Sequence, residues 1–173
     1  MKLIRVTAAA LVLVVVTATA AVAQQVIYVV RHAERADSAP AAGQAMTAPA
    51  NDPPLSAAGH ARAARLATML RSADIWQVLA TEFQRTRQTA APLAKALNLE
   101  VTTSPARETD ALLARIREAK GNVLVVGHSN TVPEILKRLG IKDAIAIPES
   151  EYDNLFIVTR PATGDPILVR LRF

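Results

Sequence analysis

The strongest constraint on the fold is an apolar run that ends abruptly in charged or catalytic residue types, and it occurs twice. Residues 26–30 are apolar and mostly β-branched, and Arg31 and His32 follow at once. Residues 123–126 repeat the design, and Gly127 and His128 follow. Short runs of this kind are typical of strands buried on both faces of a sheet. Because parallel strands end at one edge, we expect both histidines there, in a catalytic role.

The rest of the chain predicts helices that alternate with strands. Strands are expected at residues 25–30, 75–80, 100–103, 123–126, 155–158 and 167–171, and helices at 57–70, 84–97, 110–120 and 133–139. Ser56 is an expected N-cap, Thr131 and Glu134 fit a capping box, and Gly121 and Gly140 are expected to end helices. This alternation predicts an α/β fold, a three-layer αβα sandwich with a mostly parallel sheet and an antiparallel edge. Tyr28 and Trp76 lie in strand-like runs and are expected in the core.

Residues 1–23 have the features of an export signal. Lys2 and Arg5 give a positive start, residues 8–17 are apolar, and a small-x-small sequence precedes Gln24. We expect cleavage after Ala23, which leaves residues 24–173 as one domain in the periplasm or outside the cell. The alternative is an uncleaved membrane anchor, but the run is short for a span and no second candidate follows. Stable membrane insertion after cleavage is therefore not expected.

Composition excludes several classes of protein. The chain has no cysteine, so it has no disulfide, thiolate nucleophile or cysteine metal site. Its formal net charge is +5, but the basic residues are dispersed and only 3% of residues are aromatic, which does not favour a nucleic-acid partner. Arginine outnumbers lysine, which favours bidentate recognition of anions. The sequence predicts no particular oligomeric state.

The residues that follow the predicted strands suit phosphoryl transfer. Arg31, His32, Arg85 and His128 would gather in one crevice of the sheet. A neutral imidazole can attack phosphorus to form a phosphohistidine that water then hydrolyses, while guanidinium groups hold the phosphoryl oxygens. Backbone N–H groups at Ser129, before the last helix, can add donors. Arginine meets the phosphoryl charge, so we expect no metal and no other cofactor.

A general acid must still protonate the leaving oxygen. Glu34 lies beside the nucleophile candidate, and Glu108 and Asp110 lie before the third helix, also at the carboxyl end of a predicted strand. Glu34 could instead orient an arginine, and Glu108 and Asp110 could simply charge the start of the helix. The residues leave these three alternatives open.

Taken together, these motifs resemble the histidine phosphatase superfamily, the phosphoglycerate mutase-like family. Arg31-His32-Ala33 is similar to the family's Arg-His-Gly motif, with alanine in place of glycine. Segments 81–90 and 127–130 resemble its second and third motifs, and the Leu-Ser-x-x-Gly sequence within 52–59 is typical of the family's entry into the first helix. The resemblance covers nearly all of residues 24–173.

The resemblance implies the fold and the roles of individual residues. It implies that His32 is the phosphorylated nucleophile, that Arg85 binds phosphate and that His128 completes the pocket. Arg35 occupies a position where some branches carry another phosphate-binding cation. Because Ser129 follows His128, the His-Asp pair of the acid phosphatase branch is missing, which places the chain nearer the mutase-like branch. That branch takes its acid from the loop after the third strand, where Glu108 lies.

These observations predict an exported phosphomonoesterase that acts on a small or envelope-associated phosphorylated substrate. The pocket walls are expected from residues 36–54 and 148–152. One alternative is a phosphoglycerate-type mutase, although the signal and the lack of long insertions count against it. Another is a catalytically weak module that binds phosphate.

Overall fold

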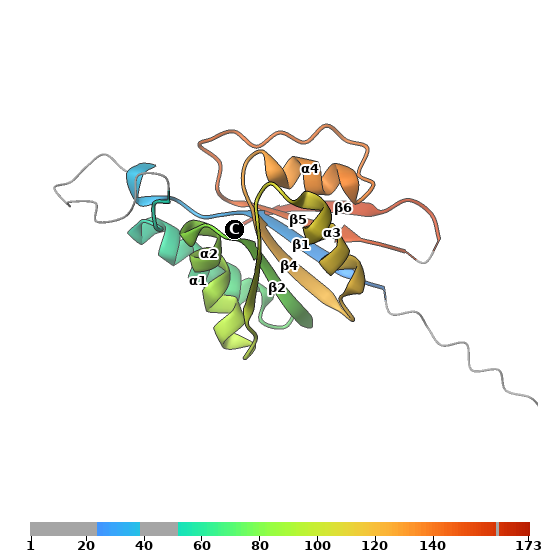
Figure 1. Cartoon of the computed structure of the whole chain (residues 1–173), viewed down its shortest axis with the longest axis horizontal. Helices are drawn as coiled ribbons and strands as arrows, with labels where there is room; N and C mark the ends of the chain where they lie inside the picture. The colour runs from blue at the N-terminus through green and yellow to red at the C-terminus, as the bar shows by residue number, and fades with distance from the viewer. Residues whose placement is uncertain (1–23, 39–51, 162) are drawn as a thin grey trace, which may run out of the picture.

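A computed structural model describes residues 24–38, 52–161 and 163–173 (Figure 1). The predicted signal and most of the 36–54 segment lie outside the described residues. The elements in chain order are β1 (Val26–Arg31), a 3₁₀ turn (Ala36–Ser38), α1 (Ala57–Leu70), β2 (Ile75–Thr81), α2 (Gln84–Ala96), β3 (Val101–Ser104), α3 (Thr109–Glu118), β4 (Asn122–Gly127), α4 (Thr131–Arg138), β5 (Asn154–Thr159) and β6 (Ile167–Arg172).

The strands form one six-stranded sheet in the order β3-β2-β4-β1-β5-β6. β1, β2, β3 and β4 are parallel, and β5 and β6 add the antiparallel edge that the sequence predicts. β1 lies between β4 and β5, with Arg31 in register with Gly127. His32 and His128 therefore leave neighbouring strands at the same edge, and the backbone N–H of His32 donates to the Gly127 carbonyl at 2.9 Å.

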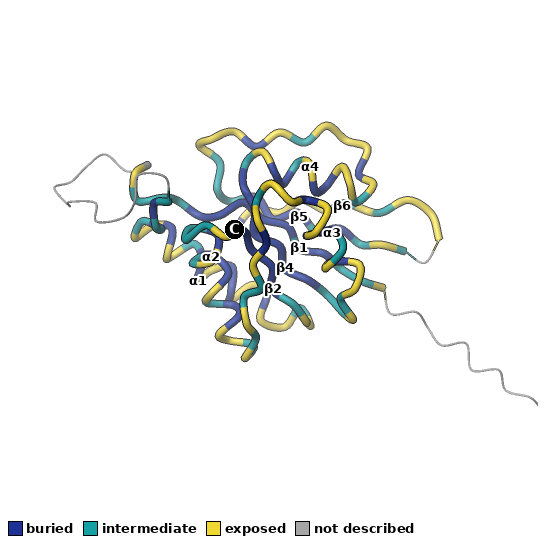
Figure 2. The backbone as a smooth tube through the Cα atoms, in the orientation of Figure 1, coloured by how far each residue is buried: buried dark blue, intermediate teal, exposed yellow. Residues whose placement is uncertain are grey.

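Helices cover both faces of this sheet, which confirms the three-layer αβα sandwich (Figure 1). On one face α1 and α2 pack apolar side chains such as Leu66 and Leu93 against β1, β2 and β4. On the other face α3 and α4 do the same with Ile116 and Ile135. The central strands β1, β2, β4 and β5 are the most deeply buried part of the backbone, whereas the edge strand β6 is mostly exposed (Figure 2). Among the described residues no helix is long and apolar enough to span a membrane.

The first helix forms where the sequence places it. α1 has the predicted bounds, and the Ser56 hydroxyl accepts a hydrogen bond from the Gly59 N–H at 3.1 Å, as expected of an N-cap. α4 is followed by Gly140 at φ 98°, the left-handed conformation that ends helices.

Three local expectations are wrong. α3 ends at Glu118, because Ala119 is already extended, so Gly121 does not cap it. α4 begins at Thr131 after the N-cap Asn130, so Thr131 is not the N-cap of a capping box. Its hydroxyl instead accepts the backbone N–H of His128 at 2.8 Å. Trp76 is 63% exposed rather than in the core, because the β2–β4 register shifts between Ile75 and Gln77. Tyr28 is half-buried against the core.

Candidate active site

The carboxyl ends of β1, β2 and β4 surround a cavity of about 310 Å³. Its walls come from the segments that follow these strands and from the loop before β5. The lining residues are Arg31, His32, Arg35, Phe83, Arg85, Ala106, Arg107, His128, Ser129, Asn130, Thr131 and Glu149. The structure thus brings together six of the seven predicted site residues, and Glu108 is the exception. Glu149 shows that the predicted 148–152 wall is present.

His32 is 3% exposed and its ring is held in one tautomer. Nδ1 lies 2.8 Å from the Ala33 carbonyl oxygen, which can only accept, so Nδ1 carries the proton and Nε2 keeps its lone pair. The pKa of His32 is lowered to about 3, chiefly by burial and also by His128, Arg31 and Arg85, while the Ala33 hydrogen bond opposes the shift. The imidazole is therefore a neutral nucleophile at neutral pH.

Ala33, which departs from the family's glycine, fits its position without strain. Its methyl group is fully buried in a small cluster with Leu55 and Ala63. Its N–H donates to the Thr89 hydroxyl at 3.0 Å. The segment after β1 is thus fixed by α1 and α2, and the substitution leaves His32 in place.

His128 lies opposite His32, with 5.4 Å between the ring centroids. Its Nε2 is 2.9 Å from the Thr81 hydroxyl, and its Nδ1 is 3.4 Å from Arg85 Nη2. Burial lowers the pKa of His128 to about 4, with further contributions from Arg85, Arg31 and Arg35. Both imidazoles are therefore neutral near pH 7.

Arg31 is 2% exposed and is bound to the loop before β5. Its Nη1 donates to the carbonyl oxygens of Pro148, Glu149 and Glu151 at 2.9, 3.0 and 3.1 Å. Its Nη2 contacts a carboxylate oxygen of Glu149 at 2.5 Å, and its guanidinium lies over the Tyr152 ring. Nε is buried and has no hydrogen-bond partner among the described residues. Arg31 thus fixes the loop before β5 through Nη1 and Nη2, while its Nε–H remains available to a ligand.

Arg85 uses fewer of its donors. Its guanidinium lies over the Phe83 ring, and Nη1 is 3.7 Å from Asp52. Nε and Nη1 are buried without hydrogen-bond partners in the described part of the chain. Burial and the charge of Arg35 lower the pKa of Arg85, and Asp52 only partly opposes them. The carboxylates of the site thus leave several buried guanidinium N–H groups without a hydrogen bond among the described residues, which favours an anionic ligand.

Two other predicted residues, Ser129 and Arg35, lie at the margin of the cavity. The Ser129 hydroxyl donates to Glu149 at 2.5 Å, so the predicted anion-binding residue has a carboxylate as its present partner. Arg35 Nε lies 2.9 Å from Asp37 Oδ1. Arg87, which carries no predicted role, is exposed on α2. Within residues 24–38, 52–161 and 163–173 no three His, Cys, Asp or Glu side chains cluster as metal ligands.

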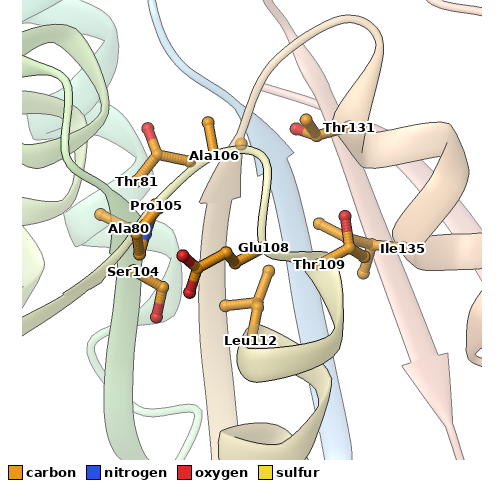
Figure 3. Close-up of a pocket in the computed structure, with 11 residues that line it drawn as sticks. Ala80, Thr81, Ser104, Pro105, Ala106, Glu108, Thr109, Leu112, Thr131 and Ile135 are labelled. Carbon is orange, nitrogen blue, oxygen red and sulfur yellow. The ribbon is translucent and has the colours of Figure 1, made fainter.

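The three acid candidates lie outside the lining of this cavity. Glu34 forms a bidentate ion pair with Arg62, with oxygens at 2.6 and 2.9 Å. Burial acts to raise its pKa, but the Arg62 hydrogen bonds leave it below the ordinary value. Asp110 pairs with Arg138. Glu108 is exposed at the start of α3 and lines an adjoining cleft. It also lines the small pocket drawn in Figure 3, where its carboxylate points toward Ser104 and away from Thr131.

Sequence reasoning missed Glu149, Thr81 and Thr86 as contributors to the site. Glu149 is 77% exposed and lines the cavity beside Arg31 and Ser129. Thr81 ends β2 and contacts His128, and Thr86 contacts Thr81 at 2.8 Å. The signal for Thr81 is its place at the end of an apolar strand, the same signal that identifies His32. Glu149 lies in an aperiodic loop with no such signal.

Comparisons with known proteins point to the same family that the sequence motifs resemble. The sequence model of the histidine phosphatase superfamily (branch 1) matches residues 27–111. No curated protein sequence gives a significant match. One similar solved structure is a proposed phosphohistidine phosphatase SixA from Agrobacterium tumefaciens, with a TM-score of 0.63 and 22% identity over 86% of this chain and 98% of that one.

Two other similar structures are also described as phosphatases. One is a proposed α-ribazole-5'-phosphate phosphatase from Escherichia coli K-12, with a TM-score of 0.64 and 17% identity over 86% of this chain and 96% of that one. The other is a mycobacterial glucosyl-3-phosphoglycerate phosphatase in complex with VO3, with a TM-score of 0.60 and 13% identity over 81% and 98%. At these identities the likeness shows the fold alone.

The fold and the cavity define an αβα protein with two facing histidines and an arginine-rich pocket at the carboxyl edge of its sheet. The matched residues 27–111 include Arg31, His32 and Arg85 of that pocket. The chain belongs to the histidine phosphatase superfamily.

Proposed function

We propose that this protein is a phosphomonoesterase that works through a phosphohistidine on His32. One observation carries the proposal: guanidinium N–H groups of Arg31 and Arg85 that have no hydrogen-bond partner among the described residues are buried beside a neutral imidazole. A buried N–H donor without a hydrogen-bond acceptor costs free energy, and an anion in the cavity would remove that cost. A phosphoryl group would satisfy them and place its phosphorus near the lone pair of His32 Nε2.

The reaction would proceed in two displacements. Nε2 of His32 attacks phosphorus, the bond to the ester oxygen breaks, and the leaving alcohol takes a proton. Water then attacks the phosphohistidine, and the N–P bond breaks to release inorganic phosphate and free His32. Arg31 and Arg85 hold the equatorial oxygens as charge builds in each transition state. The Ala33 carbonyl keeps Nδ1 protonated and so directs both displacements to Nε2.

Glu149 is the better placed donor for the leaving alcohol. It is the acidic side chain among the residues that line the cavity, whereas Glu108 lines the adjoining cleft. The Ser129 hydrogen bond and the Arg31 charge lower the pKa of Glu149, against its slight burial. A bound phosphoryl group would compete for both contacts and bring like charge close, which favours the protonated carboxyl.

The cavity suits a small phosphomonoester, since about 310 Å³ holds a phosphoryl group and a compact leaving group. The export features of residues 1–23 favour a substrate in the periplasm or outside the cell, free or attached to the envelope. We expect the signal to be removed, leaving residues 24–173 as the working domain.

Hydrolysis of para-nitrophenyl phosphate by the purified protein tests the proposal. His32→Ala should abolish turnover, while His60→Ala, which changes an exposed histidine on α1, should leave it intact. Brief incubation with radiolabelled substrate should yield an acid-labile phosphoenzyme that the His32→Ala protein lacks. Turnover that survives His32→Ala would refute the phosphohistidine mechanism. Phosphate binding without turnover on a broad panel of phosphomonoesters would instead indicate a binding module.

A further inference from the structure

A chain of hydroxyl groups connects His128 to the backbone at the start of α2. The Nε2 atom of His128 is 2.9 Å from Thr81 Oγ1, which is 2.8 Å from Thr86 Oγ1. Thr86 Oγ1 in turn lies 2.8 Å from the Phe83 carbonyl oxygen and 3.0 Å from the Thr81 carbonyl oxygen. Thr81, Thr86 and His128 are all buried, so water does not compete for these bonds.

The two carbonyl oxygens fix the direction of every bond in the chain. A carbonyl oxygen only accepts, so the single proton of Thr86 must point to the backbone. Thr86 Oγ1 therefore accepts the proton of Thr81, and Thr81 Oγ1 can only accept from His128. The Nε2 atom of His128 must then carry the proton.

Arg85 gives the same assignment independently. Its guanidinium only donates, and its Nη2 lies 3.4 Å from His128 Nδ1, so Nδ1 must be the unprotonated atom. The contact at Nδ1 and the hydroxyl chain at Nε2 thus assign the same tautomer to His128. His32, whose Nδ1 faces the Ala33 carbonyl, has the opposite tautomer.

We propose that Thr81 and Thr86 are positioning residues that hold His128 in the Nε2–H tautomer and, through its Nδ1, orient the Arg85 guanidinium toward the cavity. The sequence of contacts runs from the Phe83 carbonyl through Thr86, Thr81 and His128 to Arg85. With Nη2 directed to Nδ1, the Nε and Nη1 atoms of Arg85, which have no hydrogen-bond partner in the described part of the chain, stay available for an anion. The catalytic consequence rests on the proposed phosphatase function, but the tautomer does not.

Nitrogen-15 spectra of the ring nitrogens test the tautomer directly. In the full-length protein labelled at histidine, with His60→Ala used to assign the exposed ring, His128 should show a protonated Nε2 and an unprotonated Nδ1 at pH 7. Thr81→Val removes the hydroxyl while it keeps the branched shape, and should convert His128 to a mixture of tautomers. His32 should keep its Nδ1 proton, which provides an internal control. Thr81→Ser should restore the single tautomer.

Kinetics and phosphate binding test the consequence. In Thr81→Val both kcat/KM and the affinity for inorganic phosphate should fall about 10- to 100-fold, by analogy with the loss of a side chain that orients a metal-binding histidine, and Thr81→Ser should recover most of the loss. Thr86→Ala should act in the same direction if Thr81→Val does not fold. Thr103→Val, the same change at an exposed position of β3, should have no effect.

The outcomes separate the two proposals. A protonated Nδ1 on His128 in the unmodified protein, or a Thr81→Val spectrum with the tautomer unchanged, would overturn the positioning role. The expected tautomer and its loss in Thr81→Val, in a protein that turns over no phosphomonoester, would uphold the positioning role and overturn the phosphatase.

Discussion

Arg31 and Arg85 face the same cavity, but the rest of the molecule uses them differently. Nη1 of Arg31 shares its two protons among three loop carbonyl oxygens, so Arg31 also holds residues 148–151 in place. Arg85 makes no hydrogen bond of good geometry to a protein oxygen in the described part of the chain, and stacks on Phe83 instead. Arg31 therefore contributes to the stability of the fold as well as to anion binding, whereas Arg85 contributes mainly to anion binding.

Replacing each arginine with glutamine should reveal this division. Arg85→Gln should weaken binding of inorganic phosphate about 10- to 100-fold, because a charged hydrogen bond contributes roughly 1.5–3 kcal/mol. The free energy of unfolding of the Arg85→Gln protein should differ from that of the unmodified protein by less than about 1 kcal/mol. Arg31→Gln should lower that free energy by about 2–4 kcal/mol, because it leaves buried carbonyls unpaired. Titration calorimetry and urea unfolding measure both, with the exposed Arg87→Gln as control. Equal stability losses at both sites would contradict the division.

Glu149 can be tested as proton donor through the leaving group of the substrate. A para-nitrophenolate ion leaves without a proton, whereas an alkoxide needs one, so only alkyl phosphates depend strongly on the acid. Glu149→Gln should lower kcat about 100-fold on an alkyl phosphate and less than about 10-fold on para-nitrophenyl phosphate. Glu108→Gln should lower both little. The reverse pattern would assign the acid to Glu108 after all.

At this scale the sequence identifies residues that follow strands and misses residues brought in by loops. His32, His128 and Arg85 follow apolar strands, and their placement was predictable because parallel strands share one edge. Glu149 meets Arg31 across 118 positions of chain, from a loop without periodicity. Thr86 reads as an ordinary helix residue, and its part in the site depends on the direction of one hydroxyl proton.

At the scale of elements, the start of α1 holds the segment that carries His32. The Ser56 N–H donates to the Glu34 carbonyl at 2.9 Å, and the Ala36 N–H donates to the Pro54 carbonyl at the same distance. Gly59 brings the helix against this segment so closely that a Cβ there would lie 2.2 Å from the Glu34 carbonyl oxygen. The Leu-Ser-x-x-Gly sequence thus has a packing reason, since only glycine allows the approach.

Gly59→Ala should therefore damage both stability and the site. The methyl group meets backbone that cannot rotate away, so we expect a loss of about 2 kcal/mol in the free energy of unfolding and reduced phosphatase activity. Gly121→Ala is the matched control, because its Cβ would meet the ring of the exposed Trp76, which can move. Urea unfolding of the two variants decides the matter. An equal cost for both would show that the approach of α1 to Glu34 is not constrained.

Where the ends of a helix differ from the prediction, residues outside that helix make the hydrogen bonds that a local capping motif was expected to make. α3 was expected to run to residue 120, but the Gln25 amide donates to the carbonyl oxygens of Ile116 and Gly121 at 2.8 and 3.2 Å. These bonds satisfy backbone groups at the end of the helix, so no glycine cap is needed. The Thr131 hydroxyl is likewise taken by the backbone of His128. Neither partner is visible within a local window of sequence.

At the scale of the whole molecule, the alternation of elements was enough to predict the layers but not the order of the strands. Alternating strands and helices require a covered parallel sheet, and the final pair of strands with a turn between them requires an antiparallel edge. Several orders satisfy those rules. The observed order places β1 between β4 and β5, and this sets His32 beside His128 and brings the loop before β5 over Arg31.

This arrangement buries two neutral histidines, and the whole fold should therefore lose stability as the pH falls. The pKa values of His32 and His128 are about 3 and 4 in the folded protein, against about 6.5 when unfolded. Between pH 6.5 and 4 the unfolded chain binds more protons, so the free energy of unfolding must decrease with falling pH, by up to about 2.7 kcal/mol per unit for two groups.

The pH range distinguishes the stability lost through the two histidines from the stability lost through the carboxylates. Glu34 and Glu149 have pKa values below the ordinary 4.5, so the stability that they contribute is lost mainly below that pH. Urea unfolding at pH 7, 6 and 5 should show a steep decline that flattens in the double variant His32→Gln, His128→Gln. An equally steep decline in the double variant would show that other groups bind the protons, and that the two imidazoles are not held neutral by burial.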